Sequence, residues 1–253
     1  MNVLELFKGT GSVGKVCEAL GHNVISVDIV ERYKPTHLCD IMDFDYKQYP
    51  KNYFSVVWGS PPCTNYSKLK NLWFGRKLKD GTIYSPEQLQ IDMNEADKIV
   101  LKTFEIIDYF NPYYWYVENP ATGRLKDREI MKDKTIFYDV DYCMYSDWGY
   151  KKTTRVWTNK TDFIPLRCDG KGNCGNIIEI ETNGALHTGY KKPIKSKTRL
   201  LHKSPLGDTN KSREIRKQCK HKKNVDDYGG GSNRDMRYRI PPDLILSLIF
   251  NIS

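Results

Sequence analysis

The stretch that most constrains the fold of this chain is residues 56–67, Val-Val-Trp-Gly-Ser-Pro-Pro-Cys-Thr-Asn-Tyr-Ser. Its apolar, β-branched start predicts a buried strand, which the double proline ends in a rigid turn with Cys63 at its tip. In an open α/β sheet, the loops after the strand carboxyl ends line the ligand crevice. We therefore expect Cys63 to be a reactive thiol whose pKa is lowered at the entry to a following helix, although a small buried cysteine beside a turn is the alternative.

A glycine-rich turn follows the first predicted strand, residues 2–6. Gly9, Gly11 and Gly14 precede an amphipathic run that reaches Leu20. The order of strand, glycine turn and helix is typical of a nucleotide-binding first crossover, in which the backbone approaches a ligand closely. The spacing alone suits NAD, FAD and S-adenosylmethionine equally.

Two acids at the ends of predicted strands indicate which part of such a cofactor binds here. Asp28 ends a second predicted strand about twenty residues after the glycines, where a carboxylate accepts ribose hydroxyls. Asp40 follows a third short strand and can receive an adenine amino group. With the glycine turn and the adjacent Ile29 and Ile41, these acids predict an adenosine site in an α/β fold.

A long predicted helix leads to a strand that would place the carboxyl group of Glu118 near the Cys63 thiol. Ser85, Pro86 and Gln88 form a helix start, and an apolar stripe continues to Asn111-Pro112. The next predicted strand, 113–117, ends at Glu118. Glu118 is then placed to hand a proton to a substrate bound over Cys63, although a helix-capping acid is the competing explanation.

Two further segments have predicted roles. Residues 68–84 form a basic, glycine-punctuated loop, which we expect to be a lid over substrate. The pattern over 140–158 predicts an antiparallel hairpin that carries Arg155. The lid would offer five basic side chains to phosphates, namely Lys68, Lys70, Arg76, Lys77 and Lys79.

One segment carries the positive charge of the chain. Positions 191–223 hold thirteen Lys or Arg residues against two acids, whereas the formal net charge of all 253 residues is +9. Such a segment is either a solvated face or a binding region for a polyanion, most simply nucleic acid. No secretory or membrane-spanning run is visible, and seven cysteines fit free thiols, so we expect a cytoplasmic protein.

In chain order, the glycine turn, Asp28, Asp40, Pro-Pro-Cys63, Glu118-Asn-Pro and the Arg155 segment resemble the motifs of the DNA cytosine-5 methyltransferases. The resemblance is greatest to compact, single-chain members of bacteriophages and large DNA viruses. It implies a Rossmann-like S-adenosylmethionine-dependent methyltransferase sheet with helices on both faces over residues 1–160 and 229–253. It also implies a small, loop-rich target-recognition insertion at 161–228.

The same resemblance implies roles for single residues. Cys63 adds to cytosine C6, Glu118 contacts N3, and Arg155 steadies the base carbonyl and the nucleophile. The partner is double-stranded DNA with the cytosine flipped out, and the protein is a monomer without a membrane partner, in the host cell if it is viral. S-adenosylmethionine is held by Phe7, Gly9, Gly11, Asp28, Ile29, Asp40 and Ile41.

Departures from the family pattern keep alternatives open. Lys151, Thr153 and Arg155 stand where the family has Gln-x-Arg-x-Arg, so one arginine is missing. Arg237-Tyr238 replaces the last Gly-Asn motif, and we assign no cofactor contact there. The alternatives are a transfer RNA substrate, exocyclic amino methylation, for which Ser60-Pro-Pro fits half of the motif, and a catalytically silent DNA-binding relative.

Cysteines and histidines in the insertion raise the question of a metal. Cys168 and Cys174, with His187, Cys219 and His221, could supply four zinc ligands. Their spacing is wider than in a ribbon knuckle, and free thiols in a loop-rich region explain them as well. We therefore assign no metal from the sequence.

Overall fold

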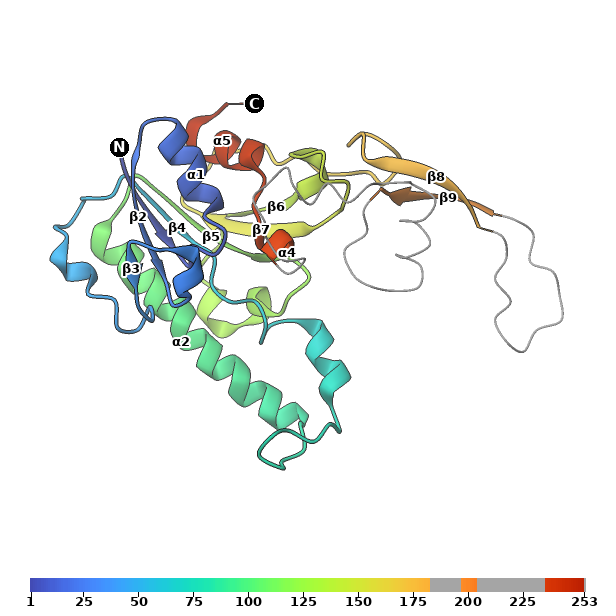
Figure 1. The fold of residues 1–253 in the computed structure, drawn as a ribbon, viewed down its shortest axis with the longest axis horizontal. Coiled ribbons are helices and arrows are strands. Elements are labelled where there is room, and N and C mark those ends of the chain that lie inside the picture. Colours follow the sequence, from blue (N-terminus) through green and yellow to red (C-terminus); the bar gives the residue numbers. More distant parts are fainter. Residues whose placement is uncertain (183–196, 204–234, 253) are drawn as a thin grey trace. The chain divides into compact units, whose positions relative to one another are not determined.

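The structure is a computed structural model that describes residues 1–182, 197–203 and 235–252. The chain divides into two compact units, each described here by itself (Figure 1). The sheet unit comprises Met1–Val140, Thr153–Pro165 and Tyr238–Ser253, and the insertion unit comprises Asp141–Lys152 and Leu166–Arg237. The predicted boundaries at 160 and 229 stay predictions, and the division groups 141–152 with the insertion unit.

A seven-stranded mixed sheet forms the centre of the sheet unit, in the order β3-β2-β1-β4-β5-β7-β6. β1 pairs in parallel with β2 and β4, β4 pairs in parallel with β5, and β7 is antiparallel to β5. This arrangement confirms the predicted Rossmann-like sheet. The strands are β1 (Asn2–Leu6), β2 (Asn23–Asp28), β3 (His37–Leu38), β4 (Val56–Gly59), β5 (Tyr114–Pro120), β6 (Phe137–Asp141) and β7 (Thr153–Thr158).

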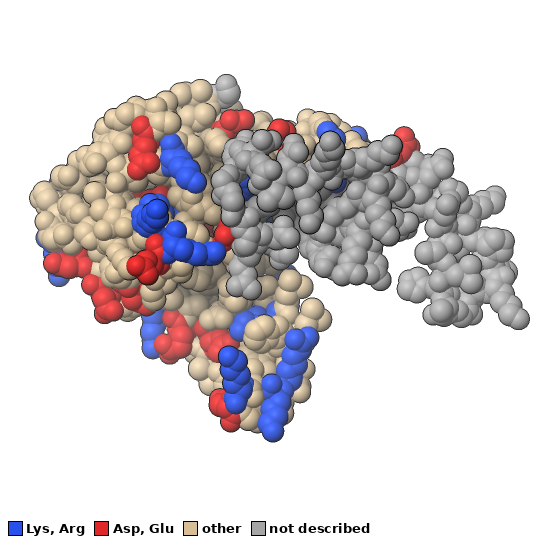
Figure 2. All heavy atoms as spheres, in the orientation of Figure 1, with Lys and Arg blue, Asp and Glu red and all other residues tan. Residues whose placement is uncertain are grey.

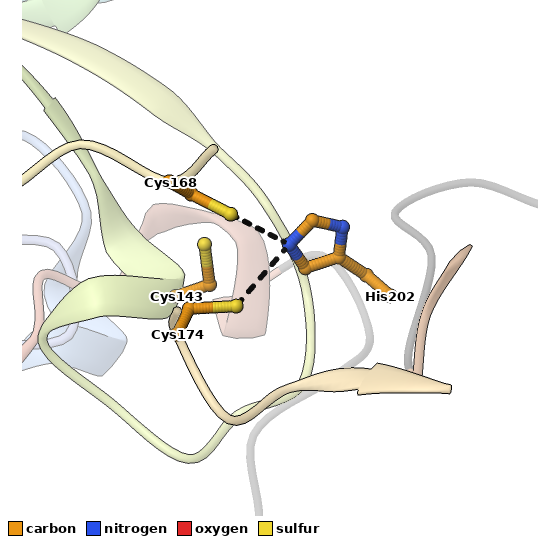
Figure 3. A group of neighbouring side chains, drawn as sticks. All are labelled: Cys143, Cys168, Cys174 and His202. Carbon is orange, nitrogen blue, oxygen red and sulfur yellow. Dashed lines mark hydrogen bonds between the residues drawn. The ribbon is translucent and has the colours of Figure 1, made fainter. Parts of the chain in front are cut away.

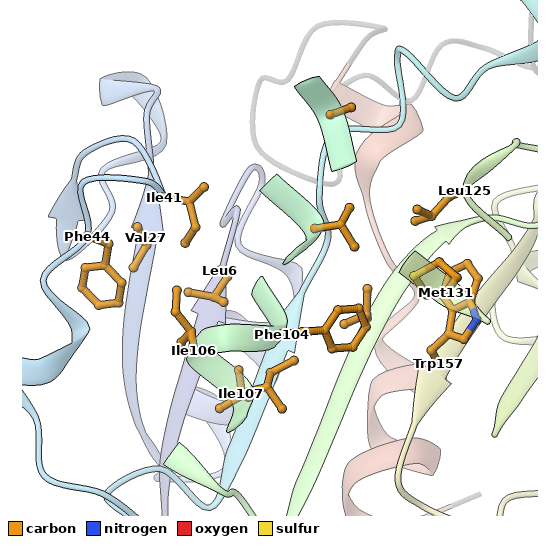
Figure 4. Close-up of a cluster of buried hydrophobic side chains, with 14 of the residues drawn as sticks. Leu6, Val27, Ile41, Phe44, Phe104, Ile106, Ile107, Leu125, Met131 and Trp157 are labelled. Carbon is orange, nitrogen blue, oxygen red and sulfur yellow. The ribbon is translucent and has the colours of Figure 1, made fainter. Parts of the chain in front are cut away.

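Helices cover both faces of the sheet, as predicted (Figure 1). α2 (Pro86–Phe110) packs on one face, where Phe104, Ile106 and Ile107 join a buried cluster with Leu6 and Trp157 (Figure 4). On the other face, α1 (Ser12–Ala19) contacts α5 (Pro242–Phe250). There the Tyr116 hydroxyl of β5 donates to the Leu248 carbonyl at 2.7 Å.

The start of α2 follows the sequence prediction. The Ser85 hydroxyl accepts the Gln88 N–H at 3.2 Å, Pro86 is the first helical residue, and Asn111 ends the helix in a left-handed conformation. A capped start and a continuous apolar stripe stabilise this helix against the sheet. The prediction of this element is confirmed.

The hairpin expected over 140–158 has a different form. β6 ends at Asp141, a short 3-10 helix (η6, Tyr142–Met144) follows, and β7 begins only at Thr153. In the insertion unit, β8 (Ile177–Thr182) pairs antiparallel with β9 (Lys197–His202). Among the described residues, no helix is long and apolar enough to cross a membrane.

The remaining helices are short. α4 (Asp235–Tyr238) precedes α5. The 3-10 helices besides η6 are η1 (Glu31–Tyr33), η2 (Tyr46–Gln48), η3 (Lys68–Trp73), η4 (Leu125–Asp127) and η5 (Glu129–Met131).

Candidate active site

The direction in which successive strands are added to the sheet reverses between β1 and β4. The chain leaves β1 toward β2 and β3 on one side, and β4 and β5 lie on the other side. Ligands of open α/β sheets bind at such a switch point, outside the strand carboxyl ends. The loops that leave β1 and β4 carry the glycine turn and Cys63, respectively. The structure therefore brings the two predicted motifs to neighbouring strand ends.

The glycine turn adopts backbone conformations that glycine favours. Gly9 and Gly11 have φ angles of +48° and +68°, and Phe7, just before them, has a φ of +61°. A left-handed residue that is not glycine costs about 1–2 kcal/mol and is typical of ligand-binding turns. The strain at Phe7 is consistent with a turn shaped for close approach of a ligand.

Glu5, which the sequence analysis did not single out, holds the start of α1. Its carboxylate accepts the N–H groups of Val13 at 3.1 Å and Gly14 at 3.2 Å. A Cβ on Gly14 would lie 2.8 Å from Glu5 Oε2, so glycine is required for this approach. Burial raises the pKa of Glu5 to about 7, against the two N–H groups and Lys8, which lower it. The visible signal was an acid inside an otherwise apolar strand.

Asp28 joins the end of β2 to the glycine turn. Its Oδ2 accepts the Gly9 N–H at 2.8 Å and its Oδ1 accepts the Val30 N–H at 2.8 Å. A carboxylate has about four acceptor positions, so each oxygen retains capacity for a ribose hydroxyl. Beside it, the Ile29 side chain is 66% exposed, which suits an apolar contact with a bound ring. These residues fit an adenosine moiety.

The second acid lies in a similar local turn. Asp40 Oδ1 accepts the Met42 N–H at 2.9 Å, and Asp40 is half-buried. The next side chain, Ile41, is buried near Val27 and Phe44 (Figure 4). The Ile41 side chain therefore belongs to the core, and any cofactor contact at that position falls to its backbone.

Cys63 is half-buried in the loop after β4 and is not part of a disulfide. The Tyr66 N–H donates to the Cys63 carbonyl at 3.2 Å, and the 3-10 helix η3 begins only at Lys68, where the Ser67 hydroxyl accepts the Leu69 N–H. The predicted helix entry at the thiol is therefore wrong. Residues 63–67 instead form a turn, in which the N–H groups of Tyr66 and Ser67 donate to the carbonyls of Cys63 and Thr64.

The loop that carries Cys63 is anchored at its far side. The buried Tyr66 donates its hydroxyl to Asp97 of α2 at 2.9 Å, and Arg128 pairs with the same carboxylate at 2.6 Å. Arg124 donates its N–H to the Tyr66 carbonyl and its Nη1 to the Ser67 carbonyl. Loop position is thus fixed by buried, charge-assisted contacts, which are stronger than neutral ones.

The end of β5 contacts the same loop directly. The buried Asn119 donates from Nδ2 to the Pro61 carbonyl at 2.9 Å. Its neighbour Glu118 is 7% exposed and lies within β5. Since β4 and β5 pair in parallel, the acid and the thiol loop meet at the same sheet edge. The sequence analysis predicts a catalytic role for Glu118 but none for Asn119.

The Arg155 guanidinium, on β7, contacts two residues of β6. It pairs with Asp139 through Nε–Oδ1 at 2.7 Å and Nη2–Oδ2 at 2.9 Å, and lies 3.7 Å above the Phe137 ring. Arg155 is opposed to Asn119, whereas Glu118 is opposed to Val156. Because opposed residues share a sheet face, Arg155 and Glu118 lie on adjacent strands but opposite faces.

The predicted lid has structure of its own. η3 is followed by a short hairpin with a bridge between Lys77 and Ile83. Lys70 is 9% exposed, pairs with Asp92 at 3.2 Å and lies over the Trp73 ring, so its predicted phosphate contact is wrong. The other four predicted basic residues are exposed. Figure 2 shows Lys and Arg side chains gathered on this lobe together with a few acids.

Known proteins are similar to this chain at two levels, in structure and in sequence. No protein-family model matches the chain. Solved structures with a similar fold include a methyltransferase of Entamoeba histolytica, with 16% identity and a TM-score of 0.44 over 65% of this chain and 56% of that one. Another is an S-adenosylmethionine-dependent methyltransferase of Archaeoglobus fulgidus, with 19% identity and a TM-score of 0.30 over 47% of this chain and 44% of that one. These structural similarities are too low to carry an argument.

The sequence relationship is much stronger. The chain is 32% identical over 251 residues to the protein named probable DNA (cytosine-5)-methyltransferase of Frog virus 3 (isolate Goorha). The match covers 98% of this chain and 99% of the relative. The chain belongs to the DNA (cytosine-5)-methyltransferase family.

Proposed function

We propose that this protein transfers a methyl group from S-adenosylmethionine to C5 of cytosine in DNA, with Cys63 as the nucleophile. The observation that carries the proposal is the 2.9 Å bond from Asn119 to the Pro61 carbonyl. This bond couples the Pro-Pro-Cys loop to the strand end that carries Glu118. Family membership supports the same reaction.

Cys63 supplies the covalent step. Cytosine C5 is too weak a nucleophile to take a methyl group directly, so a thiolate adds first. A bond forms between Cys63 Sγ and C6, the C5–C6 double bond opens, and its electron pair makes C5 nucleophilic. After C5 is methylated, loss of the C5 proton to solvent restores the double bond and expels the thiolate.

Glu118 stabilises the charge that this addition creates. As electron density moves into the ring, a carboxyl at N3 donates a proton or a hydrogen bond. The low exposure of Glu118 strengthens such a contact, because less water competes for it. The resemblance assigns Arg155 to the base carbonyl and the nucleophile. Because Arg155 is paired with Asp139 and lies on the sheet face opposite to Glu118, we propose instead that it positions β7 beside Asn119.

The cofactor-binding residues form the other half of the site. When bound, S-adenosylmethionine would supply the electrophilic sulfonium methyl group and leave as the neutral thioether S-adenosylhomocysteine. Gly9 and Gly11 would let the backbone approach the cofactor closely. Asp28 would accept hydrogen bonds from its ribose hydroxyls, and Ile29 would pack against its adenine. Phe7 and Asp40 complete the group that we assign, together with the backbone of Ile41.

A base stacked in a duplex cannot be reached on both ring faces, so the cytosine leaves the helix. The exposed lysines and arginine of the segment after Cys63 suit contact with phosphates, and the exposed Leu69 and Leu72 suit contact with unstacked bases. We assign target recognition to 161–228. Most of the basic segment 191–223 lies outside the described residues.

The experiment is a methyl-transfer assay on two substrates, duplex DNA and transfer RNA, with nucleoside mass spectrometry of the product. We expect 5-methylcytosine in DNA, and none with Cys63→Ser. Methyl groups on an exocyclic nitrogen would refute the C5 chemistry. 5-Methylcytosine found only in RNA would retain the chemistry but refute the substrate, and no transfer at all would support a silent relative.

A further inference from the structure

Four side chains that are distant in sequence converge within the insertion unit (Figure 3). Cys143 comes from η6, Cys168 and Cys174 flank a tight loop, and His202 ends β9. Their sulfur atoms and one ring nitrogen all lie within 4.8 Å of one another. Cys143 and Cys168 are buried, and all three thiols are free.

The separations match those of a tetrahedral metal site. Zinc bonds of about 2.3 Å to sulfur and about 2.0–2.1 Å to nitrogen place ligand sulfur and nitrogen about 3.6 Å apart. Here His202 Nε2 is 3.5 Å from Cys168 Sγ and 3.7 Å from Cys174 Sγ. A disulfide would require about 2.05 Å between sulfurs. We propose that Cys143, Cys168, Cys174 and His202 bind one Zn²⁺ ion.

The surrounding backbone is arranged to hold these ligands. The Gly170 N–H donates to Cys168 Sγ at 3.4 Å, as expected beside a sulfur that carries negative charge. The buried Asn176 donates from Nδ2 to the carbonyls of Cys143 at 3.0 Å and Cys174 at 3.1 Å. One amide thus ties together the two segments that carry these cysteines.

The loop between Cys168 and Cys174 is also fixed. Asp169 Oδ1 accepts the N–H groups of Lys171 at 2.7 Å and Gly172 at 3.2 Å. In the other direction across the loop, the Asp169 N–H donates to Asn173 Oδ1 at 3.1 Å. The six-residue spacing, too wide for a ribbon knuckle in sequence, is therefore closed by a compact turn that presents both thiols to one point.

The chemistry of the ligand set indicates a structural ion. Four protein ligands close the coordination sphere and leave no position for substrate. The insertion unit also has a small core in its described part, and small modules commonly need a metal or disulfides for stability. Its buried apolar side chains are Tyr142, Cys143, Tyr145, Tyr150 and Cys168.

This ligand set revises the one considered from sequence. Cys168 and Cys174 remain, but Cys143 and His202 complete the four ligands. His187, Cys219 and His221 lie outside the described residues. No spacing pattern signals Cys143 or His202, because η6 and β9 meet the loop only in the folded chain.

The test is elemental analysis of the full chain, purified without chelator. We expect about one zinc per chain. Cys143→Ser and His202→Asn should each lose at least nine tenths of it, whereas Cys39→Ser, a half-buried thiol outside the group, should keep it. Cys63→Ser should also keep it, so the zinc result stands apart from the catalytic proposal.

Because a ligand variant can fail to fold, a second measurement uses the unaltered protein. A mercurial should release the zinc as the cluster thiols react, and Co²⁺ in its place should give thiolate charge-transfer bands and the intense visible bands of a tetrahedral site. Purified protein with less than a tenth of a zinc per chain and freely reacting thiols overturns the proposal. Zinc that persists in both folded ligand variants overturns this choice of ligands.

Discussion

The two units of this protein fix their side chains in different ways. In the sheet unit, a broad apolar cluster between the sheet and α2 supports the strand ends, and short polar contacts such as Asn119 to Pro61 adjust the loops. In the described part of the insertion unit, buried apolar side chains are few, and three thiols and an imidazole converge instead. A hydrophobic core and a bound metal ion are two ways to offset the conformational entropy that the chain loses on folding.

Under the two proposals, cysteines of one chain serve different purposes. Cys63 is placed on a loop at a strand end, where a thiol can reach a substrate. Cys143 and Cys168 are buried beside other ligands. If this division is correct, substitutions in the two units should separate activity from stability, and the following predictions run from the largest expected effect to the smallest.

The largest effect should follow Cys63→Ser. We expect methyl transfer to fall by at least about a thousandfold, because the hydroxyl is a far weaker nucleophile than the thiolate. Zinc content and the unfolding midpoint should be unchanged. Cys143→Ser is the matched control, with the reverse pattern of lost zinc and reduced stability of the insertion unit. Equal losses of activity with unchanged zinc in both variants would contradict the division.

Glu118→Gln should be next. Removal of a proton donor at N3 should lower the single-turnover rate by about a hundredfold or more, with little change in DNA binding. Glu95→Gln on the exposed face of α2 is the control and should leave the rate unchanged. A Glu118→Gln enzyme with the original rate would assign Glu118 to structure alone.

Glu5 should give the sheet unit a pH-dependent stability. Burial raises the pKa of Glu5 from 4.5 to about 7, so the folded state binds this proton more tightly than the unfolded state. The resulting stabilisation is complete below about pH 4.5 and is lost as pH rises through 7. On the order of 3 kcal/mol of unfolding free energy should disappear across that window.

Glu5→Gln should remove this contribution, and urea unfolding between pH 4.5 and 8 measures it. We expect a flatter pH profile in the variant than in the original chain. If both profiles have the same slope, Glu5 ionises normally under α1. That result would also weaken the case for a buried carboxylate behind the glycine turn.

Asn119→Ala should have the smallest effect. The Pro61 carbonyl would lose a buried donor, which costs about 1–3 kcal/mol of stability. Because the loop with Cys63 loosens, the turnover number should fall about tenfold, while the Michaelis constant for S-adenosylmethionine stays constant. A changed Michaelis constant with a normal turnover number would assign Asn119 to cofactor binding instead.

The sequence predicts local features of this fold well. The cap at Ser85, the apolar stripe of α2 and the run before Gly59 each specify an element through neighbouring residues, and the structure has them. The glycine turn and Asp28 could also be located from spacing. Such features depend on contacts within a few turns of chain, so they are visible before folding is considered.

Contacts between distant segments could not be read in this way. Asp139 beside Arg155 and His202 beside two cysteines both depend on which strands and loops become neighbours in the folded chain. The expected helix directly at Cys63 is absent for a related reason, because tertiary contacts of Tyr66 and Asn119 hold a non-helical turn there. Propensity alone does not specify such anchors.

The most direct test uses duplex DNA in which 5-fluorocytosine replaces cytosine at methylated positions. Fluorine at C5 cannot leave as a proton does, so the bond between Cys63 and C6 should persist after methylation. We predict a covalent protein–DNA adduct that depends on S-adenosylmethionine, maps to Cys63 by peptide mass spectrometry, and is absent with Cys63→Ser. An active enzyme that forms no adduct, or forms one at another residue, would contradict the proposed mechanism.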